Sequence, residues 1–259
     1  MSLQKYDHIK ILHSKCVPNT PITSRYLKHL GISNQLQYKY VTSGWLERFG
    51  SGVFKFPNAR VTWEGVLFAL QKQLDKKIHL GGRSALDYYG MGHFLSLSIQ
   101  KIFLFKPPSE RLPTWFSEYT WSNIELAVIS SSLFNSKLGL EAEIVGGFDM
   151  SVSAPERAAF EVASLVGKHH NLNELVFLSE NFSNFRPALM QSLFEACHSK
   201  TAKRVLLMLG QFHGHLWFNR LNLNTIDIGS GVIQLEGGGT YIKDVKLSIS
   251  KQLEDYTNV

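Results

Sequence analysis

The clearest pattern of apolar and polar positions lies in residues 22–56, which read ITSRYLKHLGISNQLQYKYVTSGWLERFGSGVFKF. Its first part predicts a short helix that begins at Thr23 or Ser24, both favourable capping residues, and runs to Leu30. Gly31 predicts the end of this helix, because glycine takes the left-handed C-cap conformation without a steric cost. A tight turn therefore separates this helix from the next apolar pattern.

The second helix of this stretch has one apolar and one polar face. Ser33 is placed to cap it, and Leu36, Tyr40 and Val41 recur at the spacing of a single helical face. The opposite face carries Asn34, Gln35, Tyr38, Lys39 and Thr42. Asn and Gln side chains can pair with adenine edges, and Lys and Tyr can reach guanine edges or phosphates. The pattern therefore predicts a helix that reads bases in a DNA groove.

A small hairpin follows this helix. Residues 45–49 and 53–56 predict two strands, and the glycines at 50 and 52 predict the turn between them. Two helices followed by a two-stranded wing form a winged helix, whose second helix enters the major groove. The residues expected to contact phosphates are Arg25, Lys28, Arg48, Ser51 and Lys55. Ser33, at the start of the second helix, belongs to the same predicted DNA-binding set.

The distribution of charge supports this interpretation. Residues 1–57 contain eight Lys or Arg and two acidic residues, a net charge of +6, and the whole chain also has a net charge of +6. The other 202 residues are therefore neutral overall, and all of the excess positive charge lies on the predicted DNA reader, as expected for nucleic-acid binding. The alternative is that the winged helix binds a partner protein, and that residues 58–259 act on RNA or on a partner enzyme.

The rest of the chain predicts an α+β protein of three parts. A first helix over residues 2–14 supports the winged helix, which closes as a domain at residues 1–57. Residues 58–150 predict a mixed α/β domain, with helices at 62–74 and 83–89 and strands at 78–80, 101–105, 124–130 and 140–145. Residues 151–259 predict a helix-rich region, which begins with a capping box at 153–156 and ends in strands. Residues 58–259 can also form one domain.

Composition indicates a globular chain, because 44% of its residues are hydrophobic and 19% are charged. The N-terminus lacks the apolar stretch of a signal peptide, and no run of about 18 apolar residues predicts a membrane span. The two cysteines, Cys16 and Cys197, are isolated and give neither a disulfide framework nor a metal-binding spacing. We therefore expect a cytoplasmic protein without a membrane segment.

The candidates for enzymatic or metal chemistry are weak. A zinc site needs three or four ligands, and no Asp, Glu or Cys completes the clusters at His169–His170 or at His213 and His215. We expect these histidines at surface or capping positions, with neither a metal nor another cofactor. Glu141 and Glu143 alternate along a predicted strand, which is typical of a solvated face. No nucleophile elbow is present, so the sequence does not predict an enzyme.

Two further features each have two interpretations. Gly81 and Gly82 join a predicted strand to a helix, which favours a tight turn with Arg83 on the surface; alternatively, Arg83 contacts nucleic acid or a partner. The second feature is an aromatic cluster near one loop, made of Trp115, Phe116, Tyr119 and Trp121. Such clusters are usually part of a core, and the alternative is a contact patch for a partner or a second copy.

Four segments of the sequence resemble one known family. They read GISNQLQYKYVTSGWLERFGSGVFKFP, TWEGVLFALQKQL, IHLGGRSALDYYGMGHFL and SAPERAAFEVASL. In this order they resemble the AbiEi antitoxins of bacterial abortive-infection (type IV toxin–antitoxin) systems, through most of residues 20–165. The most specific parts are Gly44-Trp-Leu-Glu-Arg48 and His79-Leu-Gly-Gly-Arg-Ser-Ala-Leu86, with support from Pro155-Glu-Arg157.

The resemblance implies a function in two parts. It implies that the N-terminal winged helix binds inverted repeats of double-stranded DNA in the promoter of its own operon and represses it. It also implies that the C-terminal part neutralises a nucleotidyltransferase toxin encoded beside it, without a stable complex being assumed. One winged helix covers only a half-site, so repression is expected to place two copies on the DNA.

Overall fold

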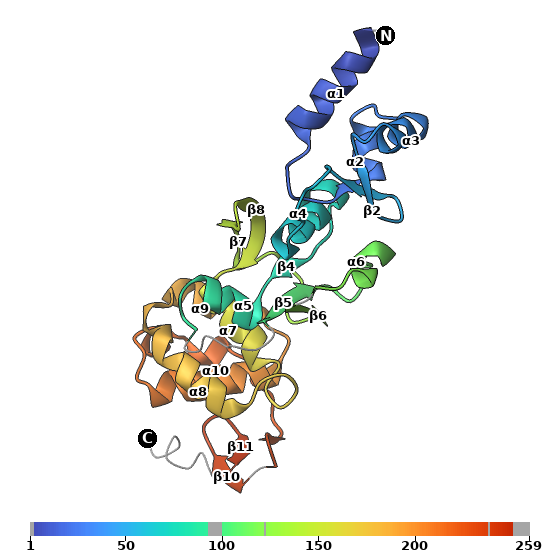
Figure 1. The fold of residues 1–259 in the computed structure, drawn as a ribbon. Coiled ribbons are helices and arrows are strands. Elements are labelled where there is room, and N and C mark those ends of the chain that lie inside the picture. The colour runs from blue at the N-terminus through green and yellow to red at the C-terminus, as the bar shows by residue number, and fades with distance from the viewer. Residues whose placement is uncertain (1–2, 93–99, 122, 238, 251–259) are drawn as a thin grey trace. The chain divides into compact units, whose positions relative to one another are not determined.

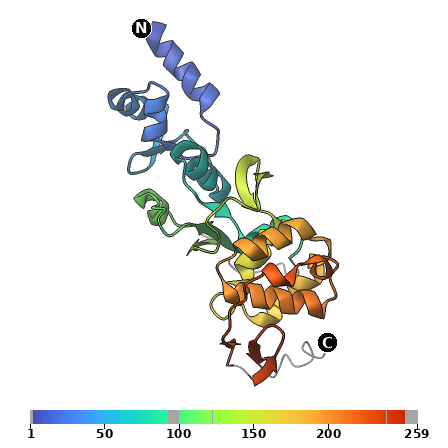
Figure 2. The same cartoon turned by 180° about the vertical axis from the view of Figure 1, so that it is seen from behind.

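A computed structural model of the chain describes residues 3–92, 100–121, 123–237 and 239–250 (Figure 1 and Figure 2). The chain divides into two compact units. The first contains Met1–His79, Lys106–Ser122 and Ala142–Ser151, and the second contains Leu80–Phe105, Asn123–Glu141 and Val152–Val259. The boundaries predicted from the sequence, at residues 57 and 150, define a different partition, which stays a prediction.

The first unit begins with a winged helix. Its elements are α1 (Leu3–Lys15), β1 (Ile22–Thr23), α2 (Ser24–His29), α3 (Asn34–Thr42), β2 (Glu47–Gly50) and β3 (Val53–Lys55). Strand β3 pairs antiparallel with both neighbours, so that Ile22 lies opposite Phe54 and Glu47 lies opposite Lys55. The predicted helices and the wing are confirmed. Strand β1 was not predicted, because its two residues are too few to form a pattern.

Local signals fix the ends of these helices. The Thr23 side chain caps α2 by accepting a hydrogen bond from the backbone N–H of Tyr26 at 3.2 Å. Gly31 has a φ of +82° in the turn after α2, as predicted for a glycine there. The buried core of the winged helix consists of Leu12, Cys16, Ile22, Leu27, Ile32, Tyr40, Leu46 and Phe54.

Helix α4 (Trp63–Leu74) is fastened to the winged helix by one buried amide. Gln73 donates to the carbonyl of Pro21 at 2.7 Å and accepts from the N–H of Thr23 at 2.8 Å. The backbone is close here, because a Cβ at Gly65 would lie 2.4 Å from the carbonyl oxygen of Asn19. The first unit is therefore larger than the winged helix, and it also contains α6 (Thr114–Glu118).

A five-stranded sheet has the order β6-β5-β4-β8-β7. Its strands are β4 (His79–Leu80), β5 (Gln100–Lys106), β6 (Ile124–Ser130), β7 (Leu140–Val145) and β8 (Phe148–Ser153). Strands β4 and β8 run parallel, with Leu80 opposite Val152. Four of these strands match the predicted ones closely, and β8 was not predicted.

Helices dominate the second unit, as predicted for residues 151–212. They are α5 (Gly82–Tyr88), α7 (Pro155–Ala163), α8 (Leu172–Ser179), α9 (Pro187–Ala196) and α10 (Lys200–Phe212), with 3-10 turns at Glu180–Asn184, Phe218–Arg220 and Leu223–Thr225. A small sheet of order β10-β11-β9 follows, with β9 (Ile233–Gln234), β10 (Gly239–Ile242) and β11 (Leu247–Ser250). The α+β class and the predicted terminal strands are therefore confirmed.

Helix α7 is buried along almost its whole length, and the carboxylate of its Glu161 accepts several hydrogen bonds near the beginning of the helix. Glu161 is 1% exposed and accepts hydrogen bonds from the N–H of Gly82 at 2.8 Å and from the Nε of Arg157 at 3.1 Å. It also accepts from the hydroxyl of Ser153. The predicted capping box is therefore wrong: Ala154 is the N-cap residue, because the Ser153 hydroxyl is bound to Glu161 instead of to the helix backbone.

Candidate nucleic-acid interface

Helix α3 separates its two faces as the sequence predicts. The Ser33 hydroxyl caps it by accepting from the N–H of Leu36 at 3.3 Å, and Tyr40 is fully buried on the inner face. The outer face is exposed at every predicted position: Asn34, Gln35, Tyr38, Lys39 and Thr42. Tyr38 is 62% exposed, which is high for an aromatic side chain. This face can therefore present amide, phenol and ammonium groups to a ligand.

A buried amide that the sequence analysis missed sets the position of α3. Gln37 is 3% exposed, and its Nε2 donates to the carbonyl of Ile32 at 2.9 Å. Its Oε1 accepts from the hydroxyl of Ser24, the first residue of α2, at 2.7 Å. One side chain thus connects α2, the turn and α3. Its spacing from Tyr40 and Val41, which lie three and four residues later, is the signal that could have placed it on the inner face.

Exposed cations flank α3. Arg25 and Lys28 on α2 and Arg48 on β2 are exposed. Within the described residues, none of these three side chains forms an ion pair, and neither does Lys39. Their charges are therefore available to an anionic ligand. Ser51, in the turn between β2 and β3, is exposed as well.

Lys55 differs from the other predicted phosphate contacts. It is half-buried, its Nζ lies 3.0 Å from a carboxylate oxygen of Glu47, and it donates to the carbonyl of Ala59 at 3.1 Å. Its charge is already balanced by the residue opposite it in the sheet. We therefore expect Lys55 to contribute less to phosphate binding than Arg48.

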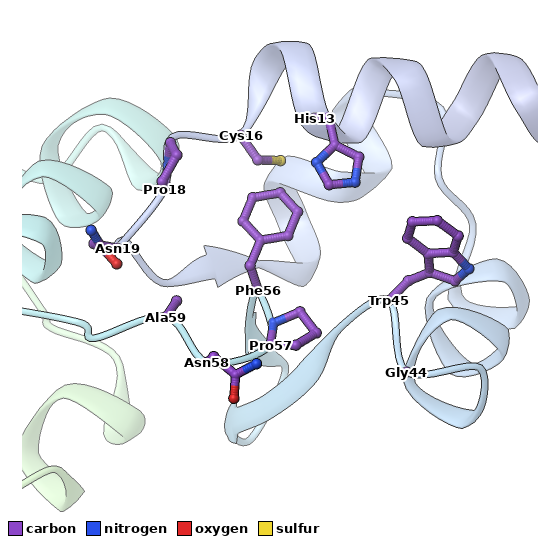
Figure 3. Close-up of a pocket in the computed structure, with 10 residues that line it drawn as sticks. All are labelled: His13, Cys16, Pro18, Asn19, Gly44, Trp45, Phe56, Pro57, Asn58 and Ala59. Carbon is purple, nitrogen blue, oxygen red and sulfur yellow. The ribbon is translucent and has the colours of Figure 1, made fainter.

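A pocket of about 580 Å³ lies between α1, the loop after it, and the two ends of the wing (Figure 3). The His13 ring lies nearly parallel to the Phe56 ring at 5.1 Å, and Trp45, 40% exposed, meets His13 edge-on at 6.0 Å. Burial raises the pKa of the Cys16 thiol to about 12, so this lining cysteine is protonated at neutral pH and is a poor nucleophile. The pocket therefore places the rings of His13, Trp45 and Phe56 beside a thiol that stays protonated.

Arg83 is not on the surface, contrary to the favoured sequence interpretation. Its side chain is 11% exposed and pairs with Asp87 at 2.7 Å and with Glu174 at 2.5 Å. Since α5 and α8 supply both carboxylates, this guanidinium stabilises the second unit. Contact of Arg83 with nucleic acid or a partner stays a prediction, and it would require these two ion pairs to open.

The histidine clusters are more buried than predicted. The ring of His215 is hydrogen-bonded to the carbonyl of Ser179 at 2.8 Å, and that of His213 to the Ser179 hydroxyl at 2.9 Å. Burial lowers the pKa of both histidines, so that both are neutral at pH 7. His170 is also buried and lies 3.2 Å from Glu174, whereas His169 is exposed. In the described part of the chain, no three His, Cys, Asp or Glu side chains gather as a metal site would require.

The remaining predictions about candidate sites have mixed outcomes. Glu141 is half-buried and pairs with Arg186 at 2.8 Å, so this strand face is less solvated than predicted. Of the aromatic cluster, Trp115 and Phe116 are buried, and Tyr119 is 38% exposed. Among the helices that the structure describes, none combines the length and the apolar character that crossing a bilayer demands.

Comparison with known proteins identifies a family. One family model, described as the N-terminal domain of the transcriptional regulator AbiEi antitoxin, matches residues 5–97. A second, described as transcriptional regulator, AbiEi antitoxin, type IV TA system, matches residues 99–250. No curated protein matches the chain. Among solved structures, the RV2827C protein from Mycobacterium tuberculosis has a similar fold, with a TM-score of 0.60 and 13% identity over 96% of this chain and 92% of that one.

Proposed function

Because the chain belongs to the AbiEi family of transcriptional regulators and type IV antitoxins, we propose that it represses its own operon by binding operator DNA. In this proposal α3 lies in the major groove and the wing lies against the neighbouring backbone. The observation that carries it is the exposed polar face of α3, flanked by cations that have no acidic partner among the described residues.

The side chains divide into two groups by what they can recognise. Asn34, Gln35 and Tyr38 would face base edges, because amides can make paired hydrogen bonds to adenine and a phenol can donate or accept. Lys39 would reach a guanine edge or a phosphate. Arg25, Lys28, Arg48 and Ser51 would contact phosphates, which supplies affinity and register without base preference. Ser33 and Thr42 lie at the two ends of the same exposed face.

Two copies of the chain would occupy one operator. One winged helix binds a half-site, so an inverted repeat requires two winged helices related by a two-fold axis. Half-sites would then be separated by about 34 Å, or a multiple of it, along the DNA axis. The copies can meet in solution or only on the DNA.

The antitoxin role is assigned to the second unit, with a nucleotidyltransferase encoded beside the gene as the toxin. The family description supports an antitoxin, and the second family model covers most of this unit. No stable complex with the toxin is assumed. Co-expression of the toxin with this chain, scored by cell growth, tests this part independently of DNA binding.

A mobility-shift titration on the DNA upstream of the gene tests the repressor role. It should be run at two salt concentrations with unrelated competitor DNA. A specific repressor gives a shift that survives competitor and weakens with salt, because phosphate contacts release counterions. If operator and competitor bind equally, the winged helix is instead a protein-binding module, and residues 58–259 would act on RNA or a partner enzyme.

A further inference from the structure

Residues 106–121, which begin at the last residue of β5, pack against the wing. Phe49 of β2 stacks on Tyr119 with ring centroids 4.5 Å apart and planes at 29°. It also meets Trp115 of α6 edge-on at 6.3 Å, and Tyr119 in turn contacts Trp121 at 4.6 Å. Figure 1 shows α6 beside β2 within the first unit. Aromatic rings from a distant part of the sequence therefore cover one side of the wing.

The backbones of β2 and α6 are also in close contact. A Cβ added at Gly50 would lie 3.0 Å from the Cβ of Trp115, so even a methyl group would press on α6. The ladder between β2 and β3 shifts register between Arg48 and Gly50, at the place where α6 packs. Helix α6 thus contacts β2 at the residues where the register shifts.

The other end of this segment is fixed as well. Glu110 accepts a hydrogen bond from Lys76 Nζ at 2.9 Å and from the N–H of Lys77 at 2.9 Å, just beyond α4. Lys106 Nζ donates to the carbonyl of Glu110 at 2.9 Å. The segment is therefore held at one end by Lys76 and Lys77, after α4, and at the other by the wing, all within the first unit.

Within the wing, β3 is already held, because it pairs with β1 and places Phe54 in the buried core. Strand β2, by contrast, contains four residues and lies at the edge of the three-stranded sheet β1-β3-β2. Phe49 is not part of the buried core of the winged helix, so its packing partners come from residues 106–121. These residues belong to the second family model, although they support an element of the first.

We infer that residues 106–121 act as a wing clamp, which holds β2 in the orientation that brings Arg48 and Ser51 against DNA. Tyr119 is the positioning residue of the clamp, because its ring stacks directly on the residue that follows Arg48. The inference rests on the proposed function, since it assumes that the wing contacts operator DNA. By this inference, the orientation of the wing depends on residues outside the segment that the N-terminal family model matches.

The test compares Tyr119→Ala with Tyr88→Ala in the full chain. Tyr88 is a matched control because it is 37% exposed, against 38% for Tyr119, and also contacts a neighbouring ring, at 5.0 Å, but lies in the second unit. Loss of one aromatic pair should weaken operator binding by about two- to tenfold in the first variant. The control should bind like the wild type. Equal behaviour of the two variants would overturn the inference.

A double-mutant cycle separates positioning of the wing from a general loss of stability. If Tyr119 acts through the wing, Tyr119→Ala should have a smaller effect on affinity in an Arg48→Ala background, where the charged contact of the wing is already lost. In a Lys39→Ala background it should have its full effect, because Lys39 lies on α3 and not on the wing. The same loss in both backgrounds would mean that Tyr119 stabilises the fold generally.

Hydrogen exchange in the free protein tests the clamp without DNA. Tyr119→Ala should speed exchange of the wing amides, residues 47–55, and leave α3 unchanged. Unchanged exchange in the wing would refute the clamp. If wild-type protein shows no operator preference but the exchange result is as expected, the proposed function fails while the clamp stands as a structural device.

Discussion

The buried amide of Gln37 gives the sharpest prediction about the winged helix. Replacement of Gln37 by Leu keeps a similar side-chain volume. It removes the Nε2 that donates to the Ile32 carbonyl and the Oε1 that accepts from the Ser24 hydroxyl. Ser24 is half-buried, so its hydroxyl can turn to water, whereas the Ile32 carbonyl stays inside the protein. An unsatisfied buried carbonyl costs about 1–3 kcal/mol, so we expect the free energy of unfolding to fall by about that amount.

Thermal unfolding of the first unit measures this loss. In a unit of roughly 100 residues, each kcal/mol lowers Tm by about 4–8 °C. Because the chain contains two units, hydrogen exchange of the α2 and α3 amides should accompany the melting curve and assign the loss to the winged helix. Operator affinity should fall as well, since Gln37 fixes the angle between α2 and α3.

The matched control is Gln35→Leu, two residues away on the exposed face of α3. It should leave Tm unchanged, because surface substitutions away from special features have small effects on stability. It should reduce the preference for operator over competitor DNA, since an amide that we propose faces a base edge is lost. The reasoning is refuted if the Gln37→Leu variant has the same Tm as the Gln35→Leu variant and binds the operator like wild type.

Three further predictions concern charge, pH and close packing. Lys39→Ala should weaken operator binding and reduce the slope of log K against log salt by about one, in a mobility-shift titration over salt; an unchanged slope would argue against a phosphate contact. Burial raises the pKa of Glu156, but hydrogen bonds from Arg186 outweigh it and hold the pKa below its usual 4.5. Stability from this pair is therefore present above pH 4.5 and lost on further acidification, so Tm should fall less steeply below pH 4.5 in Glu156→Gln than in wild type. Gly81→Ala should lower Tm by several degrees, because its Cβ would lie 2.4 Å from a Glu161 carboxylate oxygen; a melting curve like that of wild type would contradict this packing.

The parts of the fold that were predictable depend on local chemistry. Ser33 caps α3 and Gly31 takes a left-handed conformation, as short-range rules require. The pairing of strands was not predictable, because Thr23 of β1 pairs with Val53, 30 residues later, and Leu80 of β4 pairs with Val152, 72 residues later, with no local signal for either partner. The predicted capping box failed for another reason: the carboxylate of Glu161, within the same helix, accepts the hydrogen bond of the Ser153 hydroxyl.

The candidate interface shows the same limit. Helical periodicity placed the polar face of α3 correctly, because exposure there depends on one helix and its own core. It could not show that Lys55 is neutralised by Glu47, since that pairing depends on the register of β2 and β3. Nor could it place Arg83, whose partner Glu174 lies 91 residues away.

The two blocks that carry most of the family resemblance outside the wing meet at one place in the second unit. Gly82, from the His79–Leu86 block, donates its N–H to Glu161, and Arg157, from the Pro155-Glu-Arg block, donates to the same carboxylate. Arg157 also donates to the carbonyls of Ser136 and Leu138, at 3.1 and 2.7 Å. A buried carboxylate with all these donors is costly to alter, because removing one partner leaves a charge unpaired. Packing thus accounts for Gly82 and Arg157, one residue from each of these two blocks. Operator choice would instead reside on the exposed face of α3, where substitutions cost little stability and regulators with the same core can read different DNA.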